Sequence, residues 1–283
     1  PSIPKGKMMG ENEAIQNSEH PQTVDTLAEA LHNLGVKPGM VLLVHSSLSK
    51  LGWVCGGAVA VVQALMKALT PEGTLVMPTH SGDLTDPSRW QHPPVPESWW
   101  QTIREQTPAF DPQFTPTRGM GRIPEVFRDM PGVLRSNHPT VSFAAFGRQA
   151  EFITSRHSLA LSLGEGSPLA RVYDLHGSIL LLGVGFGNHT SFHLSEARAK
   201  GSKIYREGSP IIEAGKRTWK VYDEIDWDDE PFENIGRDFM ATGEVTSGRV
   251  GAAAALLFDQ RRSVDFGVSW LEKHRAMREN KTS

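Results

Sequence analysis

The hydrophobic positions in the first third of the chain alternate between helical spacing and short continuous apolar runs. Apolar residues spaced for one face of a helix occupy residues 23–34. Residues 40–44 and 74–77 are apolar runs typical of buried parallel strands, and the sequence between them predicts a helix over residues 58–69. This order of elements predicts an α/β fold with a central, largely parallel sheet flanked by helices.

The rest of the chain continues this pattern and adds a second kind of strand. Residues 178–184 (Ser-Ile-Leu-Leu-Leu-Gly-Val) form the clearest strand, and a glycine-rich turn leads from it to a helix that starts near Thr190. Residues 216–226 alternate enough to predict a smaller antiparallel β element. A further strand is predicted over residues 141–146, and helices over residues 121–130, 252–259 and 264–278.

The ordered pattern is interrupted in two places. Residues 84–116 are rich in proline and tryptophan, and a stretch of this length predicts a functional loop or an embedded helix. Residues 1–20 are polar, lack the apolar run of a signal peptide, and predict a disordered arm. We therefore expect a single domain over residues 21–283 with an insertion at 84–116.

Composition narrows the function classes. The chain has 29 Lys and Arg against 32 Asp and Glu, and a net charge of −3 argues against nucleic-acid binding by bulk electrostatics. No apolar run reaches the ~18 residues of a membrane span. Cys55 is the only cysteine, which excludes an internal disulfide and a Cys-rich zinc site and favours a cytoplasmic protein.

The first candidate for chemistry is the segment His45-Ser46-Ser47-Leu48-Ser49-Lys50-Leu51-Gly52, which follows a predicted strand and precedes a predicted helix. Ligands bind at the carboxyl ends of parallel strands, and serine hydroxyls beside a helix N-terminus favour an anion. The segment lacks the Gly-Lys-Ser/Thr ending of a P-loop. It is either an anion-binding loop or a polar turn.

The second candidate is His193 with Glu196, which share one face of the predicted helix. A carboxylate that binds one imidazole nitrogen fixes the tautomer and leaves the other nitrogen free to act as a general base. His189 lies four residues before His193, which leaves a metal-dependent hydrolase open as an alternative. Thr190 stands where a zincin would have its glutamate, so the metalloprotease motif itself is absent.

The third candidate is the acidic run over residues 223–230, in which six of eight residues are Asp or Glu around Trp227. Such a run is either a solvated face or a wall that binds a cation. Because this run is so acidic, the remainder of the chain is mildly basic, which suits one cationic and one anionic substrate.

Several segments together resemble the aminoglycoside 3-N-acetyltransferase family. They occur in the family's order over about residues 22–240 and comprise residues 44–52, 56–57, 71–78, 118–128, 131–139, 167–171, 180–185 and 190–196. The resemblance implies the antibiotic acetyltransferase fold, which is distinct from the GNAT superfamily. It also implies acetyl-CoA as the donor, the 3-amino group of a 2-deoxystreptamine aminoglycoside as the acceptor, and antibiotic resistance as the result.

The resemblance also implies roles for individual residues. His193 is the expected base, with Glu196 and Asp226 as its catalytic neighbours. CoA is expected to contact the segment from His45 to Gly52 together with Arg118 and Gly119. The residues expected to meet the acceptor are His80, Asp83, Asn188, Glu224 and Asp226.

The expected partners follow from this assignment. We expect a polycationic small molecule as the acceptor, no metal ion, no nucleic acid, no membrane, and a monomer or homodimer. The alternative within the same fold is an acetyltransferase that acts on a different amine, such as a metabolite or a nucleotide.

Overall fold

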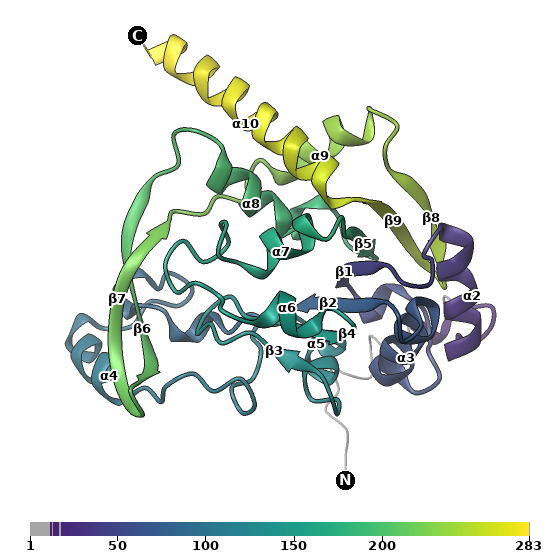
Figure 1. The fold of residues 1–283 in the computed structure, drawn as a ribbon, viewed down its shortest axis with the longest axis horizontal. Coiled ribbons are helices and arrows are strands. Elements are labelled where there is room, and N and C mark those ends of the chain that lie inside the picture. The colour runs from purple at the N-terminus through teal and green to yellow at the C-terminus, as the bar shows by residue number, and fades with distance from the viewer. Residues whose placement is uncertain (1–11, 13, 17, 283) are drawn as a thin grey trace.

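Helices cover both faces of one central sheet, as Figure 1 shows for the computed structural model. The structure describes residues 12, 14–16 and 18–282. The arm predicted over residues 1–20 therefore lies largely outside the described residues. Within it, Ser18 accepts a hydrogen bond from the main-chain N–H of Trp53 at 2.7 Å.

The central sheet has seven strands in the order β3-β4-β2-β1-β5-β9-β8. Its three middle strands are parallel: β1 (Val41–Ser46) pairs with β2 (Thr74–Pro78) on one side and with β5 (Ser178–Leu182) on the other. The outer strands are antiparallel to their neighbours and comprise β3 (Leu134–Arg135), β4 (Phe143–Gly147), β8 (Thr246–Val250) and β9 (Ala253–Asp259). The predicted sheet with a parallel centre is confirmed.

The continuous apolar runs are explained by burial on both faces of the sheet. Leu42 and Val44 enter one core, whereas Leu43 between them enters the other, because successive strand residues point to opposite faces. The first core is closed by α2 (Val24–Leu34), α3 (Gly57–Leu69) and α5 (Arg122–Arg128). The second is closed by α6 (Ala150–Thr154), α7 (Pro168–Asp174), α8 (Ser191–Arg198), α9 (Phe232–Met240) and α10 (Gln260–Thr282). Two covered faces leave the strand ends as the place for a site.

A long two-stranded ribbon of β6 (Ile204–Glu213) and β7 (Lys216–Ile225) forms the predicted smaller antiparallel element. The proline-rich insertion lies against this ribbon and contains the short helix α4 (Trp100–Gln106), which Figure 1 shows beside the ribbon. Main-chain N–H groups join the two segments: Phe110 donates to Pro210 at 3.1 Å, and Asp86 donates to the Glu207 carboxylate at 2.8 Å. The insertion is therefore an integral wall of the domain.

The predicted helix over residues 252–259 is wrong, because this segment is strand β9. Its alanines and leucines favour a helix locally, but pairing with β5 and β8 on its two sides overrides that preference. The closing helix α10 then starts at Gln260, four residues before the predicted start, and extends away from the body of the molecule in Figure 1. Among the described residues, we find no helix with the length and apolar character of a membrane span.

Candidate active site

His193 and Glu196 form a hydrogen-bonded pair on the first turns of α8. The Nδ1 of His193 lies 2.6 Å from Oε2 of Glu196, a carboxylate that is only 2% exposed. The other oxygen, Oε1, accepts the main-chain N–H of Asp228 at 3.0 Å. With the carboxylate as acceptor, the proton of the neutral imidazole is on Nδ1, and the lone pair is on Nε2. The pair has the arrangement of a general base.

Two aromatic side chains hold the imidazole from its sides. The ring centroid of Trp227 lies 5.2 Å from that of His193 in an edge-on arrangement, and the ring of Phe232 lies 4.8 Å away. The His193 side chain is 16% exposed, so it keeps one accessible edge. Packing and the carboxylate together fix the direction in which this edge points.

His193 opens into a cavity of about 200 Å³ at the carboxyl ends of the parallel strands. This is the position at which ligands bind in parallel α/β sheets. Polar residues on its wall come from β1, from the segment after β2, from the turn after β5 and from the loop before α9. They are His45, Ser46, His80, Asn188, Thr190 and Asp229. The fold therefore gathers residues far apart in the sequence around His193.

Three polar atoms of the cavity residues are buried without a hydrogen-bond partner among the described residues. They are Nε2 of His45, Nε2 of His80 and Oγ of Ser46. Leaving such an atom unsatisfied costs about 1–3 kcal/mol. Burial also lowers the pKa of His45 and of His80 to about 3, so both rings are neutral near pH 7. A cavity with neutral, unsatisfied polar groups suits a polar ligand, and its neutral rings do not repel a cation.

A groove of about 890 Å³ adjoins the cavity and shares Ser46, Gly119, Met120 and Val184 with it. Its walls also include Ser47, Leu48, Ser49, Gly52, the N-terminus of α3 at Gly57, and residues 121–123. Hydroxyls, helix N-terminal N–H groups and Arg122 suit phosphates, whereas Val54, Ile123 and Val126 suit an apolar arm. These features fit CoA, which has both kinds of group.

Some residues expected to contact CoA lie elsewhere. Leu51 is fully buried in the core beside α3, and Lys50 packs over Gly183. Arg118 pairs with Asp83 and lines a separate pocket with Trp90. Asp83 is therefore also outside the cavity around His193. Gly121, Arg122 and Ile123, which line the groove, were missed, although they belong to a segment that carried the family resemblance.

The acidic run contributes to the cavity through a different residue from the one expected. Glu224 is closed off: it is 3% exposed, accepts the N–H groups of Ser162 and Ile225, and burial raises its pKa. Asp226 pairs with Arg89 at 2.9 Å and does not line the cavity. Asp229 does line it. The acidic composition could have indicated Asp229, but nothing in the pattern separates it from its neighbours.

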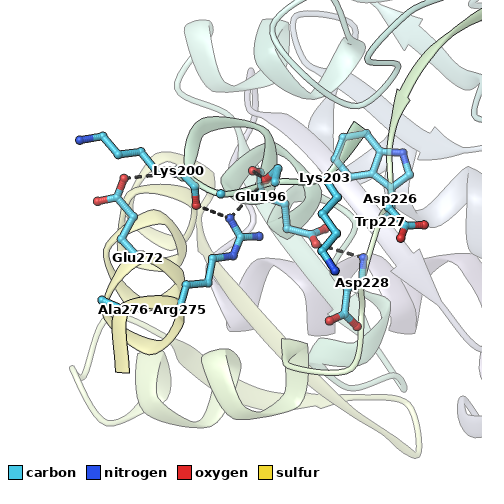
Figure 2. Close-up of a pocket in the computed structure, with 11 residues that line it drawn as sticks. Glu196, Lys200, Lys203, Asp226, Trp227, Asp228, Glu272, Arg275 and Ala276 are labelled. Carbon is cyan, nitrogen blue, oxygen red and sulfur yellow. Dashed lines mark hydrogen bonds between the residues drawn. The ribbon is translucent and has the colours of Figure 1, made fainter. Parts of the chain in front are cut away.

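Asp226 instead lines a third pocket, of about 720 Å³, on the other side of Glu196. Figure 2 shows this pocket between α8, α10 and residues 226–228, with the hydrogen bond from Asp228 to Glu196 along its wall. Side chains of both charges surround it, including Lys200, Lys203 and Glu272. The segment 226–229 therefore lies between this pocket and the cavity around His193, and it contacts both His193 and Glu196.

The geometry does not assemble the metal site of the hydrolase alternative. His189 is fully buried, its Nε2 lies 3.1 Å from Oγ of Ser263, and its ring packs against Phe192 and Phe258. It is thus a core residue that does not line the cavity of His193, although its ring lies 6.3 Å from that of His45. In the part of the chain that the structure describes, no three His, Cys, Asp or Glu side chains are grouped to hold a metal ion.

Two curated relatives cover most of the chain. The SPbeta prophage-derived aminoglycoside N(3')-acetyltransferase-like protein YokD of Bacillus subtilis is 48% identical over 257 residues, which cover 90% of this chain and 94% of that protein. Aminoglycoside N(3)-acetyltransferase VII of Streptomyces paromomycinus is 36% identical over 283 aligned positions, covering 94% of this chain and 96% of its own.

Solved structures agree with these relatives. The crystal structure of YokD from Bacillus subtilis superposes with a TM-score of 0.92 at 46% identity, covering 94% of this chain and 98% of that one. The structure of AAC-IIIb in a binary complex with CoASH superposes with a TM-score of 0.81 at 33% identity, covering 90% of this chain and 98% of that one. The structure of AAC-VIa bound to sisomicin superposes with a TM-score of 0.82 at 32% identity, covering 90% of this chain and 99% of that one.

The model of the family described as Aminoglycoside 3-N-acetyltransferase matches residues 43–272. This range contains most of β1, the strands β2 and β5, the ribbon and the helix that carries His193. The predicted fold and the predicted family are both confirmed by this match and by the relatives above. The chain belongs to the aminoglycoside 3-N-acetyltransferase family.

Proposed function

We propose that this protein transfers the acetyl group of acetyl-CoA to the 3-amino group of a 2-deoxystreptamine aminoglycoside. One observation carries the proposal: the His193–Glu196 pair opens into a cavity that is continuous with a groove suited to CoA. Within the family, AAC-IIIb has a structure with CoASH and AAC-VIa has one with sisomicin, which supports both substrate classes.

His193 supplies the proton transfer that this reaction needs. The ammonium group of the acceptor first releases one proton to solvent, and Nε2 of His193 accepts a second proton from the nitrogen as the amine attacks the carbonyl. Glu196 stabilises the imidazolium that forms. The C–N bond forms first and places charge on the thioester oxygen of acetyl-CoA, and the C–S bond breaks as this tetrahedral intermediate collapses. His193 then returns its proton to the departing sulfur, so the base is regenerated.

The walls of the cavity fit a cationic acceptor. Asp229 provides a carboxylate for its ammonium groups, whereas His45 and His80 are neutral and do not oppose its entry. Acetylation then converts one ammonium group into a neutral amide. Weaker binding of the modified drug to its acidic target would confer resistance.

Ser46 is the side chain best placed to stabilise the charge on the thioester oxygen. Several nearby main-chain donors are already used: Gly187 donates to Glu233 at 2.6 Å and Ser47 donates to Leu182 at 2.9 Å. Asn188 likewise donates to Gly185. The Ser46 hydroxyl has no partner among the described residues and belongs to both groove and cavity, so a rotation about χ1 can present it to the reacting carbonyl.

The test is a thiol-release assay with acetyl-CoA and a panel of amines. We expect turnover with gentamicin or sisomicin and none with streptomycin, which lacks 2-deoxystreptamine. NMR of the product should place the acetyl group on the 3-amino nitrogen. Turnover on small metabolite or nucleotide amines alone would instead identify a same-fold acetyltransferase with a different acceptor.

A further inference from the structure

The segment 226–229 contacts the catalytic pair and the acceptor cavity at the same time. The Trp227 ring meets the His193 ring edge-on, and the next residue, Asp228, donates its N–H to Oε1 of Glu196. The residue after that, Asp229, lines the cavity. Three consecutive residues therefore reach the base, its carboxylate partner and the space for the acceptor.

This segment is held from both ends. On one side, Asp226 pairs with Arg89 of the proline-rich insertion, and its N–H donates to Lys203 O at 2.9 Å. On the other, the side chain of Asp228 accepts the N–H of Glu230 at 3.1 Å, and α9 begins at Phe232. Asp228 and Asp229 share one peptide bond between these two anchored ends, so we expect a shift of Asp229 to change the position of Asp228 as well.

The main-chain N–H of Asp228 is also the hydrogen-bond donor to Oε1 of Glu196. Because Glu196 is almost fully enclosed in its present orientation, Oε1 has no water in place of this donor unless the carboxylate turns. Its loss would leave the carboxylate free to turn toward the pocket of Figure 2, away from Nδ1 of His193. Hydrogen-bond partners of metal-ligating residues typically change activity about 10- to 100-fold when they are removed, and Asp228 has the corresponding position behind the His193–Glu196 pair.

We propose that the Asp228 main-chain N–H is the positioning group for Glu196, and that acceptor binding at Asp229 tightens this contact and aligns His193. The inference rests on the proposed function, because the acceptor is the amine of that reaction. Segment 226–229 thus makes the alignment of His193 depend on a bound acceptor. Asp228 acts through Glu196 and does not itself touch the substrates.

The test compares D228P, which removes the N–H, with D228N, which keeps both the N–H and a side-chain oxygen for Glu230. We expect kcat of D228P to fall at least about 10-fold below that of D228N. The dissociation constant for CoA, whose groove lies elsewhere, should be the same in both variants. D229N should mainly raise KM for the acceptor. Equal kcat values in folded D228P and D228N would overturn the proposal.

A second measurement applies even if D228P does not fold. Amide hydrogen exchange in the wild-type protein, followed by NMR, should show a protected Asp228 N–H that exchanges more slowly when gentamicin is bound. Exchange at the rate of an unstructured amide, or a rate unaffected by saturating gentamicin, would overturn the coupling. If the wild type acetylates no aminoglycoside, the proposed function fails, whereas protection of Asp228 in the free protein still tests the contact itself.

Discussion

Replacing Ser46 by alanine separates a catalytic role from a structural one. The Ser46 hydroxyl is buried without a partner among the described residues, so its removal takes away no hydrogen bond of the folded state. An unsatisfied buried hydroxyl costs about 1–3 kcal/mol, part of which the substitution recovers. We expect the free energy of unfolding to stay the same or rise by up to about 1 kcal/mol, which corresponds to about 2–4 °C in Tm.

The same substitution, which leaves stability unchanged or higher, should lower kcat. Removing one donor to the charge that develops on a carbonyl oxygen typically lowers kcat by about 10²- to 10³-fold. Ser46 makes one such contact in the proposed reaction, so we expect kcat of S46A to fall about 100-fold. KM for acetyl-CoA should change little, because the other groove residues still hold the donor.

The neighbouring serine provides the matched control. Ser47 lines the groove but not the cavity, and its hydroxyl lies 3.2 Å from that of Ser49. S47A should therefore raise KM for acetyl-CoA more than it lowers kcat. The assay is thiol release at saturating aminoglycoside, combined with a thermal melt of each variant. A kcat of S46A within twofold of wild type, or a Tm lowered by several degrees, would refute the reasoning.

Three further predictions concern stability and substrate attraction. Burial lowers the pKa of His138 to about 4, so the unfolded chain, at about 6.5, takes up this proton first as the pH falls. His138 alone should thus contribute about 1.4 kcal/mol per pH unit to the loss of stability from pH 6.5 toward 4 in urea titrations, and the total decline, to which other buried histidines such as His45 and His80 add, should be shallower by that amount in H138Q. A Cβ at Gly236 would overlap the Phe186 ring, so G236A should lower stability by about 1–3 kcal/mol in the same titrations, with G82A, where the space is open, as the control. The acceptor KM should rise with added salt, and less steeply in D229N, because Asp229 is the acidic side chain on the cavity wall; equal slopes would show that it does not attract the acceptor.

The sequence predicted the centre of the sheet because local pattern and tertiary burial agree there. Residues 41–44 and 179–182 are apolar without interruption, and both faces of their strands are covered in the structure. Residues 253–259 have a similar composition with more alanine, and only their pairing between two other strands makes them a strand. The pairing of β9 with β5 joins segments that are about 75 residues apart in the sequence. A local sequence pattern cannot predict such a contact.

The candidate site shows the same division. His193 and Glu196 are three residues apart on one helix, so their contact could be predicted from spacing. Which of Asp226 and Asp229 lines the cavity could not be predicted, because Asp226 is held by an ion pair with Arg89, which lies 137 residues earlier. The enclosed position of Glu224 could not be predicted for a related reason: alternation along β7 turns its side chain inward, toward the N–H of Ser162.

The central claim is that His193 is the base of an acetyl transfer. The most direct measurement is kcat of His193→Ala in the thiol-release assay with gentamicin, beside a CoA titration of the same protein. General-base assistance is typically worth about 10²- to 10⁴-fold, so kcat should fall by that range while the dissociation constant for CoA stays near that of wild type. Full turnover by His193→Ala would contradict the account.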